Sequence, residues 1–255
     1  MARRRERLKG RDLGPQGPLV LALETGGDHL GVALWRLPEQ AGGEGGARLL
    51  EDVTQHRGHR HADAVLSLVG VMLERHELAP KDIELVAVGR GPGGFTGVRV
   101  GMATALGIGQ GLGAAIWPVD SLQALAMNGA APGAEVLAMI DARKGEVYGA
   151  LYGFGGEGEI ACLMEPMVAQ ASTVLERARE RSDQPVILGS GALAYGVGSA
   201  VPLSWHVASA AHVGSVAIRA WEAADRDGSC APSFDPAYVR ASDAEIALER
   251  RLQAE

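Results

Sequence analysis

The sequence predicts a two-lobed α/β protein in which one arrangement of strands and helices occurs twice. Near residue 19 an apolar segment ends in an acidic residue, and a short turn and a second apolar segment follow it. The same succession recurs near residue 135. In the first half, a glycine-rich loop also joins an apolar strand to a long helix. At 255 residues the chain can form one large domain or two small ones, and the repeated succession favours two.

The first half is expected to contain three strands, a helix, a further strand and a second helix. Gly26-Gly27-Asp28 separates two apolar runs, which is typical of a β-hairpin. Apolar residues then recur with helical spacing, and a last apolar run leads into the glycine-rich loop. The expected strands are residues 19–25, 29–37, 47–55 and 83–88, and the expected helix before the loop is residues 63–76.

The glycine-rich loop, residues 89–99, is the most informative segment of the chain. Its glycines and Pro92 are typical of a turn that brings the backbone close to another group. In the helix that follows, small residues recur every four positions and make a flat ridge that another helix can approach closely. The ridge residues are Gly97, Gly101, Ala105, Gly109 and Gly113. Because this helix is apolar on every side and only Arg99 is charged, we expect its own sheet and a partner protein to cover it.

The second half is expected to repeat the opening of the first. Pro118 and Ser121 mark a break, and Ser121 is expected to cap a short helix that reaches Ala126. An apolar strand, the turn 142–145 and a returning strand then follow. The remaining predicted elements are strands over 135–141, 146–152 and 185–188, helices over 172–181 and 213–224, a proline-bounded segment over 232–240 and a polar tail helix.

These elements divide the chain into three regions. Residues 1–17 are a basic N-terminal tail, and residues 18–120 are a first lobe that holds the glycine-rich loop and a dimerisation helix. Residues 121–255 are a second lobe, whose last segment is expected to pack back on the first lobe.

Charge argues against a protein that binds nucleic acid alone. The net charge is −7, whereas phosphate binding needs a basic surface. Residues 1–11 hold six basic residues and one acidic residue, so the remainder carries 18 basic against 30 acidic residues, a net charge of −12. The tail is interpreted as a disordered arm or a start-site extension, and otherwise as a nucleic-acid contact.

The sequence indicates a cytoplasmic protein. Cys162 and Cys230 are too few for a disulfide framework, which favours a reducing compartment. No apolar core follows the basic start, so no signal peptide is expected. The long uncharged run over residues 100–119 is rich in glycine and ends near Pro118, which favours a buried helix over a membrane span.

The order of three strands, a helix, a strand and a helix, occurring twice, resembles the actin–hexokinase–Hsp70 (ASKHA) superfamily. Four segments narrow the resemblance: LALETGGDHLGVAL, the unit from HADAVLSLVG to GRGPGGFTGVRVGMATALGIGQGLG, MIDARKGEVYGALY and PAYVR. On these segments, the chain is similar to the TsaB (YeaZ) family over about residues 19 to 240. The sister TsaD family has a related glycine loop, so that loop alone does not separate the two families.

Histidine spacing does separate them. The TsaD family carries an H-x-x-x-H pair that puts two imidazoles on one helix face to hold a metal ion. No two histidines of this chain lie four positions apart. Metal binding by His56, His59 and His61 stands as the alternative to a solvated, arginine- and histidine-rich connection. No metal site is predicted.

The resemblance implies a non-catalytic subunit of bacterial tRNA threonylcarbamoyladenosine (t6A) synthesis. Such a subunit pairs with a TsaD-like catalytic subunit and a TsaE-like ATPase. The complex moves threonylcarbamoyl from its adenylate onto N6 of adenosine 37 in tRNAs that read codons beginning with A. The resemblance implies no cofactor bound by this chain alone, and it leaves open whether a nucleotide binds at the boundary of the complex. It implies contact with tRNA only through the complex, no membrane, and a homodimer in isolation. The alternatives are a metal-dependent enzyme of the sister type (TsaD, peptidase M22-like) and a small-molecule kinase of the ASKHA superfamily.

The partner surface is expected at the glycine-rich loop and the helix after it. Thr96 could cap this helix, and Arg99 is either a carboxylate-binding residue across the interface or a surface side chain. A packing or interface turn is favoured over a dinucleotide site, because no acidic residue follows at the required distance. The predicted interface residues are Gly93, Gly94, Phe95, Thr96, Gly97, Arg99, Gly101, Met102, Ala105 and Gly109.

Two turns are further candidate sites. Glu24, Thr25 and Gly26 stand where the resemblance implies a phosphate loop, but the family usually has aspartate and serine at the first and third positions. They are therefore either a vestigial cofactor loop or a turn whose polar groups are satisfied within the chain. The second candidate is the charged turn of the later hairpin, either a solvated tip or a partner contact. Its residues are Asp141, Arg143, Lys144 and Glu146.

Overall fold

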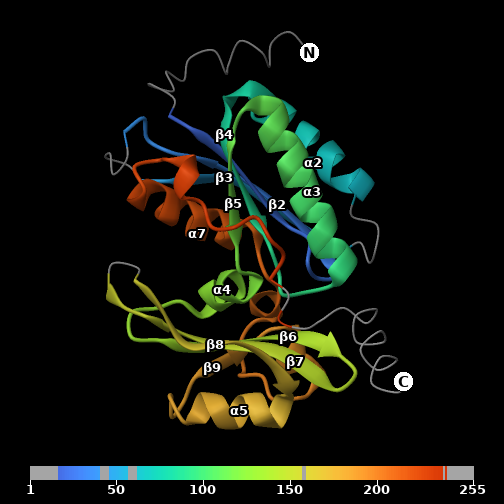
Figure 1. Ribbon diagram of the computed structural model, residues 1–255, viewed down its shortest axis with the longest axis vertical. Coiled ribbons are helices and arrows are strands. Elements are labelled where there is room, and N and C mark those ends of the chain that lie inside the picture. The colour runs from blue at the N-terminus through green and yellow to red at the C-terminus, as the bar shows by residue number, and fades with distance from the viewer. Residues whose placement is uncertain (1–16, 41–45, 57–61, 157–158, 238, 240–255) are drawn as a thin grey trace, which may run out of the picture.

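The computed structural model describes residues 17–40, 46–56, 62–156, 159–237 and 239. Two lobes, each built on one β-sheet, lie one above the other in Figure 1, and α4 lies between the two sheets. The chain has the ASKHA-like fold that the sequence predicts. The basic tail over residues 1–16, His59 and His61, and the tail from residue 240 onward lie outside the described residues. Within the described part of the chain, no helix combines the length and hydropathy needed to cross a bilayer.

The first sheet has five strands in the order β3-β2-β1-β4-β5. β1 pairs antiparallel with β2, and β2 with β3, whereas β4 is parallel to both β1 and β5. The strands are β1 (Leu19–Glu24), β2 (His29–Arg36), β3 (Arg48–His56), β4 (Ile83–Gly89) and β5 (Ala115–Val119). Because β1 and β4 are parallel, the β1–β2 turn and the glycine-rich loop after β4 leave the sheet at the same edge.

Helices cover both faces of this sheet. α2 (Ala62–Arg75) and α3 (Phe95–Leu112) lie side by side on one face, and α7 (Ala210–Ala223) lies on the other (Figure 1). Along β1 the side chains alternate between the two cores: Leu21 packs in the core that includes α2 and α3, and Val20 packs in the core that includes α7. A strand buried on both faces has a continuous apolar sequence, which is why the pattern of residues 19–25 predicts a strand.

The second sheet repeats the first four strands of the first. Its order is β8-β7-β6-β9, with two antiparallel pairs and β9 parallel to β6. α4 covers one face, and α5 and α6 contribute to the core on the other face. The elements are α4 (Ser121–Ala126), β6 (Glu135–Arg143), β7 (Glu146–Phe154), β8 (Ile160–Gln170), α5 (Ala171–Arg179), β9 (Val186–Leu188) and α6 (Ser190–Ala194). Short 3-10 turns complete the chain at Pro80–Asp82, Met127–Gly129, Leu203–His206 and Gly228–Cys230.

Within the described residues, the chain crosses between the lobes twice. The first crossing runs from the end of β5 through Asp120 into α4, which packs on the second sheet. The second runs from the Leu203–His206 turn into α7, which packs on the first sheet. A helix from late in the sequence therefore belongs to the core of the first lobe.

Candidate functional site

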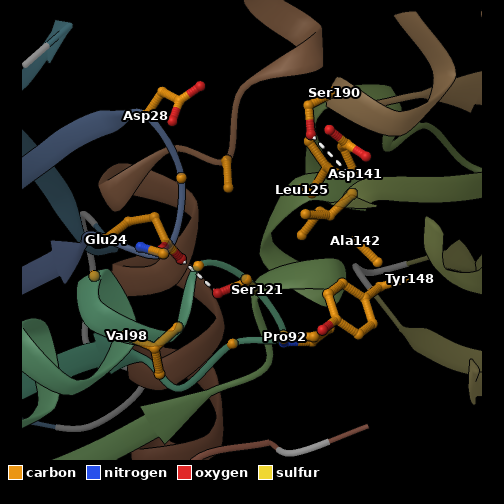
Figure 2. Close-up of a pocket in the computed structure, with 18 of the residues that line it drawn as sticks. Glu24, Asp28, Pro92, Val98, Ser121, Leu125, Asp141, Ala142, Tyr148 and Ser190 are labelled. Carbon is orange, nitrogen blue, oxygen red and sulfur yellow. Dashed lines mark hydrogen bonds between the residues drawn. The ribbon is translucent and has the colours of Figure 1, made fainter. Parts of the chain in front are cut away.

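A cleft of about 1160 Å³ lies between the lobes. Its first-lobe wall comes from the β1–β2 turn and the glycine-rich loop, and its second-lobe wall from the β6–β7 turn and α6. Figure 2 shows Glu24 and Asp28 on one side of this cleft and Asp141, Tyr148 and Ser190 on the other. The two predicted turn sites therefore face the same space.

Glu24 lies at the bottom of the first-lobe wall, and its carboxyl group is bonded within the chain. Its Oε1 accepts a hydrogen bond from the Gly26 backbone N–H at 2.7 Å. Its Oε2 accepts one from the Ser121 hydroxyl at 2.8 Å, the contact drawn as a dashed line in Figure 2. Burial raises the pKa of the Glu24 carboxyl group, and these hydrogen bonds oppose the increase.

Thr25 and Gly26 also direct their polar groups into the chain. The Thr25 hydroxyl donates to the Gly97 carbonyl at 2.8 Å, and the Gly26 carbonyl accepts from the Gly94 N–H at 2.6 Å. These contacts support the alternative that residues 24–26 form a turn satisfied internally, and they fix this turn against the start of α3.

The first two residues of the small-residue ridge of α3, Gly97 and Gly101, face this same turn, whereas a Cβ atom at Gly109 would meet Ile116 on β5. A Cβ atom at Gly97 would lie 2.1 Å from the Thr25 carbonyl oxygen, and one at Gly101 would lie 2.2 Å from the Thr25 hydroxyl oxygen. These positions, which the sequence analysis assigned to a partner surface, are buried against the chain's own β1–β2 turn. The buried residues of the predicted interface are Gly97, Gly101, Met102, Ala105 and Gly109.

The opposite side of α3 is exposed and largely apolar. It begins at Phe95, whose ring lies 3.7 Å from the Arg99 guanidinium carbon, and continues through Leu106 to Leu112. The predicted interface residues Gly94, Phe95, Thr96 and Arg99 are exposed, and Gly93 is half-buried. On the neighbouring α2, Leu66 and Val71 are also exposed. A Cβ atom at Gly70, Gly107 or Gly111 would meet no atom within 4 Å. We call the exposed residues of α2 and α3 the outer helix face.

The charged turn of the second lobe reaches toward the first. The Arg143 guanidinium lies 3.8 Å from the Asp28 carboxylate across the cleft and 3.7 Å from Asp141 beside it. The Asp141 backbone N–H donates to the Ser190 hydroxyl at 3.1 Å (Figure 2). Arg143 and Lys144 adopt left-handed backbone conformations with φ of 63° and 55°. Asp141, Arg143 and Lys144 line the cleft, and Glu146 begins β7 behind them.

The C-terminal segment contacts the first lobe, where it was expected to pack, and it also lines the cleft, which was not predicted. Pro236, Ala237 and Val239 line it, and the Ala237 N–H donates to the Arg90 carbonyl at 2.8 Å. The Arg90 side chain in turn donates to Asp120 at 2.8 Å. The motif PAYVR was noticed only as part of the family resemblance, and nothing in its pattern indicates a position beside the glycine-rich loop, about 145 residues earlier.

Histidines gather at no single point in the described residues. His29 and His56 face each other across β2 and β3 with ring centroids 5.0 Å apart. His206 is buried, and its Nδ1 accepts from the Gly189 N–H at 3.0 Å. Among the residues that the structure describes, no group of three or more histidine, cysteine, aspartate or glutamate side chains could hold a metal ion.

Each crossing between the lobes ends at a serine, at the start of α4 or α7, that donates to a carboxyl group of the first sheet. Ser121 donates to Glu24, and Ser209, which caps α7, donates to Asp52 on β3 at 3.2 Å. Burial raises the pKa of the Asp52 carboxyl group, as it does for Glu24. Both acids therefore hold their protons more tightly in the folded chain than in the unfolded chain.

This difference predicts a pH dependence of stability. Because the folded state holds these protons more tightly, the free energy of unfolding should fall as the pH rises from the ordinary pKa of Glu24 through its raised value. Glu24→Gln removes one such group, so wild type should lose stability relative to this variant as the pH rises from 4 to 8, by up to about 1.4 kcal/mol per pH unit within the titration window. Urea unfolding across this range measures the difference. The exposed Glu84→Gln should keep the wild-type dependence, and parallel curves for wild type and Glu24→Gln would contradict the prediction.

Comparisons with known proteins agree with this architecture. Residues 51–184 match the family model described as TsaD, tRNA N6-adenosine threonylcarbamoyltransferase. The Escherichia coli tRNA threonylcarbamoyladenosine biosynthesis protein TsaB is 32% identical over 182 residues, which cover 68% of this chain and 71% of that protein. The Bacillus subtilis TsaB is 29% identical over 172 residues, covering 66% and 69%. The solved structure of YeaZ from Pseudomonas aeruginosa superposes with a TM-score of 0.65 at 26% identity, over 85% of this chain and 99% of that one. The chain belongs to the TsaB (YeaZ) family.

Proposed function

We propose that this chain acts in tRNA t6A synthesis as a non-catalytic subunit that binds and activates a TsaD-like catalytic subunit. Its similarity to proteins named for t6A biosynthesis supports the pathway. The outer helix face supports a binding role, because it presents Leu66, Leu106 and Phe95 on two adjacent helices. Exposed apolar side chains gathered on two adjacent helices are typical of a protein–protein interface.

The proposal assigns the chemistry to the complex. The catalytic subunit transfers threonylcarbamoyl to N6 of adenosine 37, a TsaE-like ATPase joins the complex, and tRNA contacts this chain only within it. The chain alone holds no cofactor, and the outer helix face pairs two copies when the catalytic subunit is absent. The cytoplasm, where tRNA is modified, is its proposed compartment.

Reconstitution tests the proposal. The catalytic subunit, the ATPase, threonylcarbamoyl adenylate and an unmodified tRNA from the same organism are combined with and without this chain. Nucleoside mass spectrometry then measures t6A. We expect t6A only when the chain is present, and none from the chain alone. Equal t6A without the chain would contradict the activating role, and t6A from the chain alone would make it an enzyme.

A further inference from the structure

One side chain joins three segments that are distant in the sequence. Glu24 ends β1 in the first lobe, and Ser121, which donates to it at 2.8 Å, is the first residue of α4 on the second sheet. The contact is buried and spans 97 positions of sequence. Buried hydrogen bonds to a carboxyl group are costly to lose, since the remaining polar group is left without a partner. This bond therefore helps to fix how the lobes are placed.

The residues directly after Glu24 fix the start of α3. Thr25 donates to the Gly97 carbonyl and Gly26 accepts from the Gly94 N–H, so the turn contacts the first turn of α3 through two hydrogen bonds. Glu24 holds this turn in shape, because its Oε1 accepts the Gly26 N–H at 2.7 Å. Movement of the carboxyl group would therefore disturb both the contact with α4 and the contact between the turn and α3.

Gly89 leaves the space that this carboxyl group needs. A Cβ atom at Gly89 would lie 2.1 Å from the Glu24 Oε2 and 2.7 Å from its Cδ. Real Cβ atoms do not approach other atoms this closely, so a side chain at residue 89 would displace the carboxyl group from Ser121. An aspartate at residue 24 would be shorter by one methylene and would not reach the same place. The length of Glu24 and the absence of a side chain at residue 89 thus fit each other.

We propose that Glu24 is a positioning residue that couples the placement of the second lobe to the first turn of α3, with Gly89 as the space reserved for it. Through the first turn of α3, Glu24 sets the position of Phe95 and Arg99 on the outer helix face. This last step rests on the proposed function, because that face is where the catalytic subunit is proposed to bind. The coupling within the chain does not depend on it.

Hydrogen exchange in four proteins tests the coupling. Wild type, Gly89→Ala, Glu24→Asp and the double variant are compared, and exchange is followed at the amides of Gly94 and Val98, which bond the Gly26 and Gly94 carbonyls. Each single variant should accelerate this exchange roughly tenfold, because the turn is released from α3. The double variant should exchange no faster than Glu24→Asp, since the shorter acid leaves room for the alanine Cβ. Additive acceleration, roughly a hundredfold, would overturn the proposal.

Controls separate positioning from general loss of stability. Glu24→Gln keeps the length of the side chain: its amide oxygen can accept the Gly26 N–H, and its amide N–H can donate to the Ser121 hydroxyl, so exchange should stay within about twofold of wild type. Glu84→Asp and Gly156→Ala make the same chemical changes at exposed positions, and the new Cβ at residue 156 meets no atom within 4 Å. Both should exchange as wild type does. Equal acceleration at α3 and at α5 in Glu24→Asp would overturn the proposal, because it would report global unfolding.

Binding of the catalytic subunit separates this inference from the proposed function. Calorimetric titration should show weaker binding for Glu24→Asp than for wild type and for Glu24→Gln. If wild type itself does not bind, the proposed function fails, and the exchange data still decide the coupling. If Glu24→Asp binds as wild type does while its α3 exchange rises, the link to the outer helix face is overturned.

Discussion

Replacing Gly97 with alanine is expected to lower the free energy of unfolding by about 3 kcal/mol. The new Cβ would lie 2.1 Å from the Thr25 carbonyl oxygen, which is backbone and cannot rotate away. α3 cannot slide along the turn to relieve the clash. A Cβ atom at Gly101 would lie 2.2 Å from the Thr25 hydroxyl oxygen, and one at Gly93 would lie 2.5 Å from the Gly26 carbonyl oxygen, so the backbone is close at these positions too. The helix must move away from β1 and lose its bonds to the turn. Urea unfolding followed by circular dichroism measures the change.

Gly107→Ala is the matched control on the same helix. A Cβ there would meet no atom within 4 Å, and alanine favours a helix over glycine by up to about 1 kcal/mol. We therefore expect this variant to be slightly more stable than wild type. A Gly97→Ala protein within about 0.5 kcal/mol of wild type would show that the contact between α3 and the β1–β2 turn is looser than the structure indicates.

The glycine ridge illustrates what local sequence can predict. Small residues four positions apart indicate that some backbone approaches the helix closely, and this was correct for Gly97 and Gly101. The pattern does not say which backbone. The neighbour is the turn at Thr25 and Gly26, more than 70 positions earlier, so the prediction placed a partner protein where the chain's own hairpin lies.

Two strands were not predicted, for separate physical reasons. β5 (Ala115–Val119) follows α3 after one turn and continues the same uncharged run, so periodicity merged the two elements. Gly113, with φ of 70°, ends the helix. β8 (Ile160–Gln170) contains Pro166 and polar residues, which argue against a central strand. It is an edge strand, where proline is tolerated.

The candidate site was half predicted. Glu24 at the end of β1 was singled out because the family resemblance implies a phosphate loop there, with an internally satisfied turn as the alternative. Its partner was missed. Ser121 was expected to cap α4, but the N-cap position is Asp120, and the Ser121 hydroxyl bonds Glu24 instead. A serine at a helix start can either cap the helix or bond a distant side chain, and only the fold decides between these two roles.

The outer helix face leads to the other large effect. Leu66→Asp on α2 and Leu106→Asp on α3 are each expected to weaken binding of the TsaD-like subunit by about a hundredfold, because each puts a charge into an interface that would otherwise bury an apolar side chain. Leu66 is 60% exposed and Leu106 is 37% exposed in the isolated chain, so both variants should fold. Light scattering after size-exclusion chromatography and calorimetric titration measure complex formation.

Leu203→Asp provides the control, because it makes the same change at an exposed leucine elsewhere. Leu203 is 76% exposed and belongs to the Leu203–His206 turn, outside α2 and α3, although the first turn of α3 lines the same cleft. The variant should bind the catalytic subunit as wild type does, since an aspartate in water carries no desolvation cost. Loss of binding in Leu203→Asp with retention in Leu66→Asp would move the interface to the cleft. In that case α3 would not form the partner interface that the proposed function assigns to it.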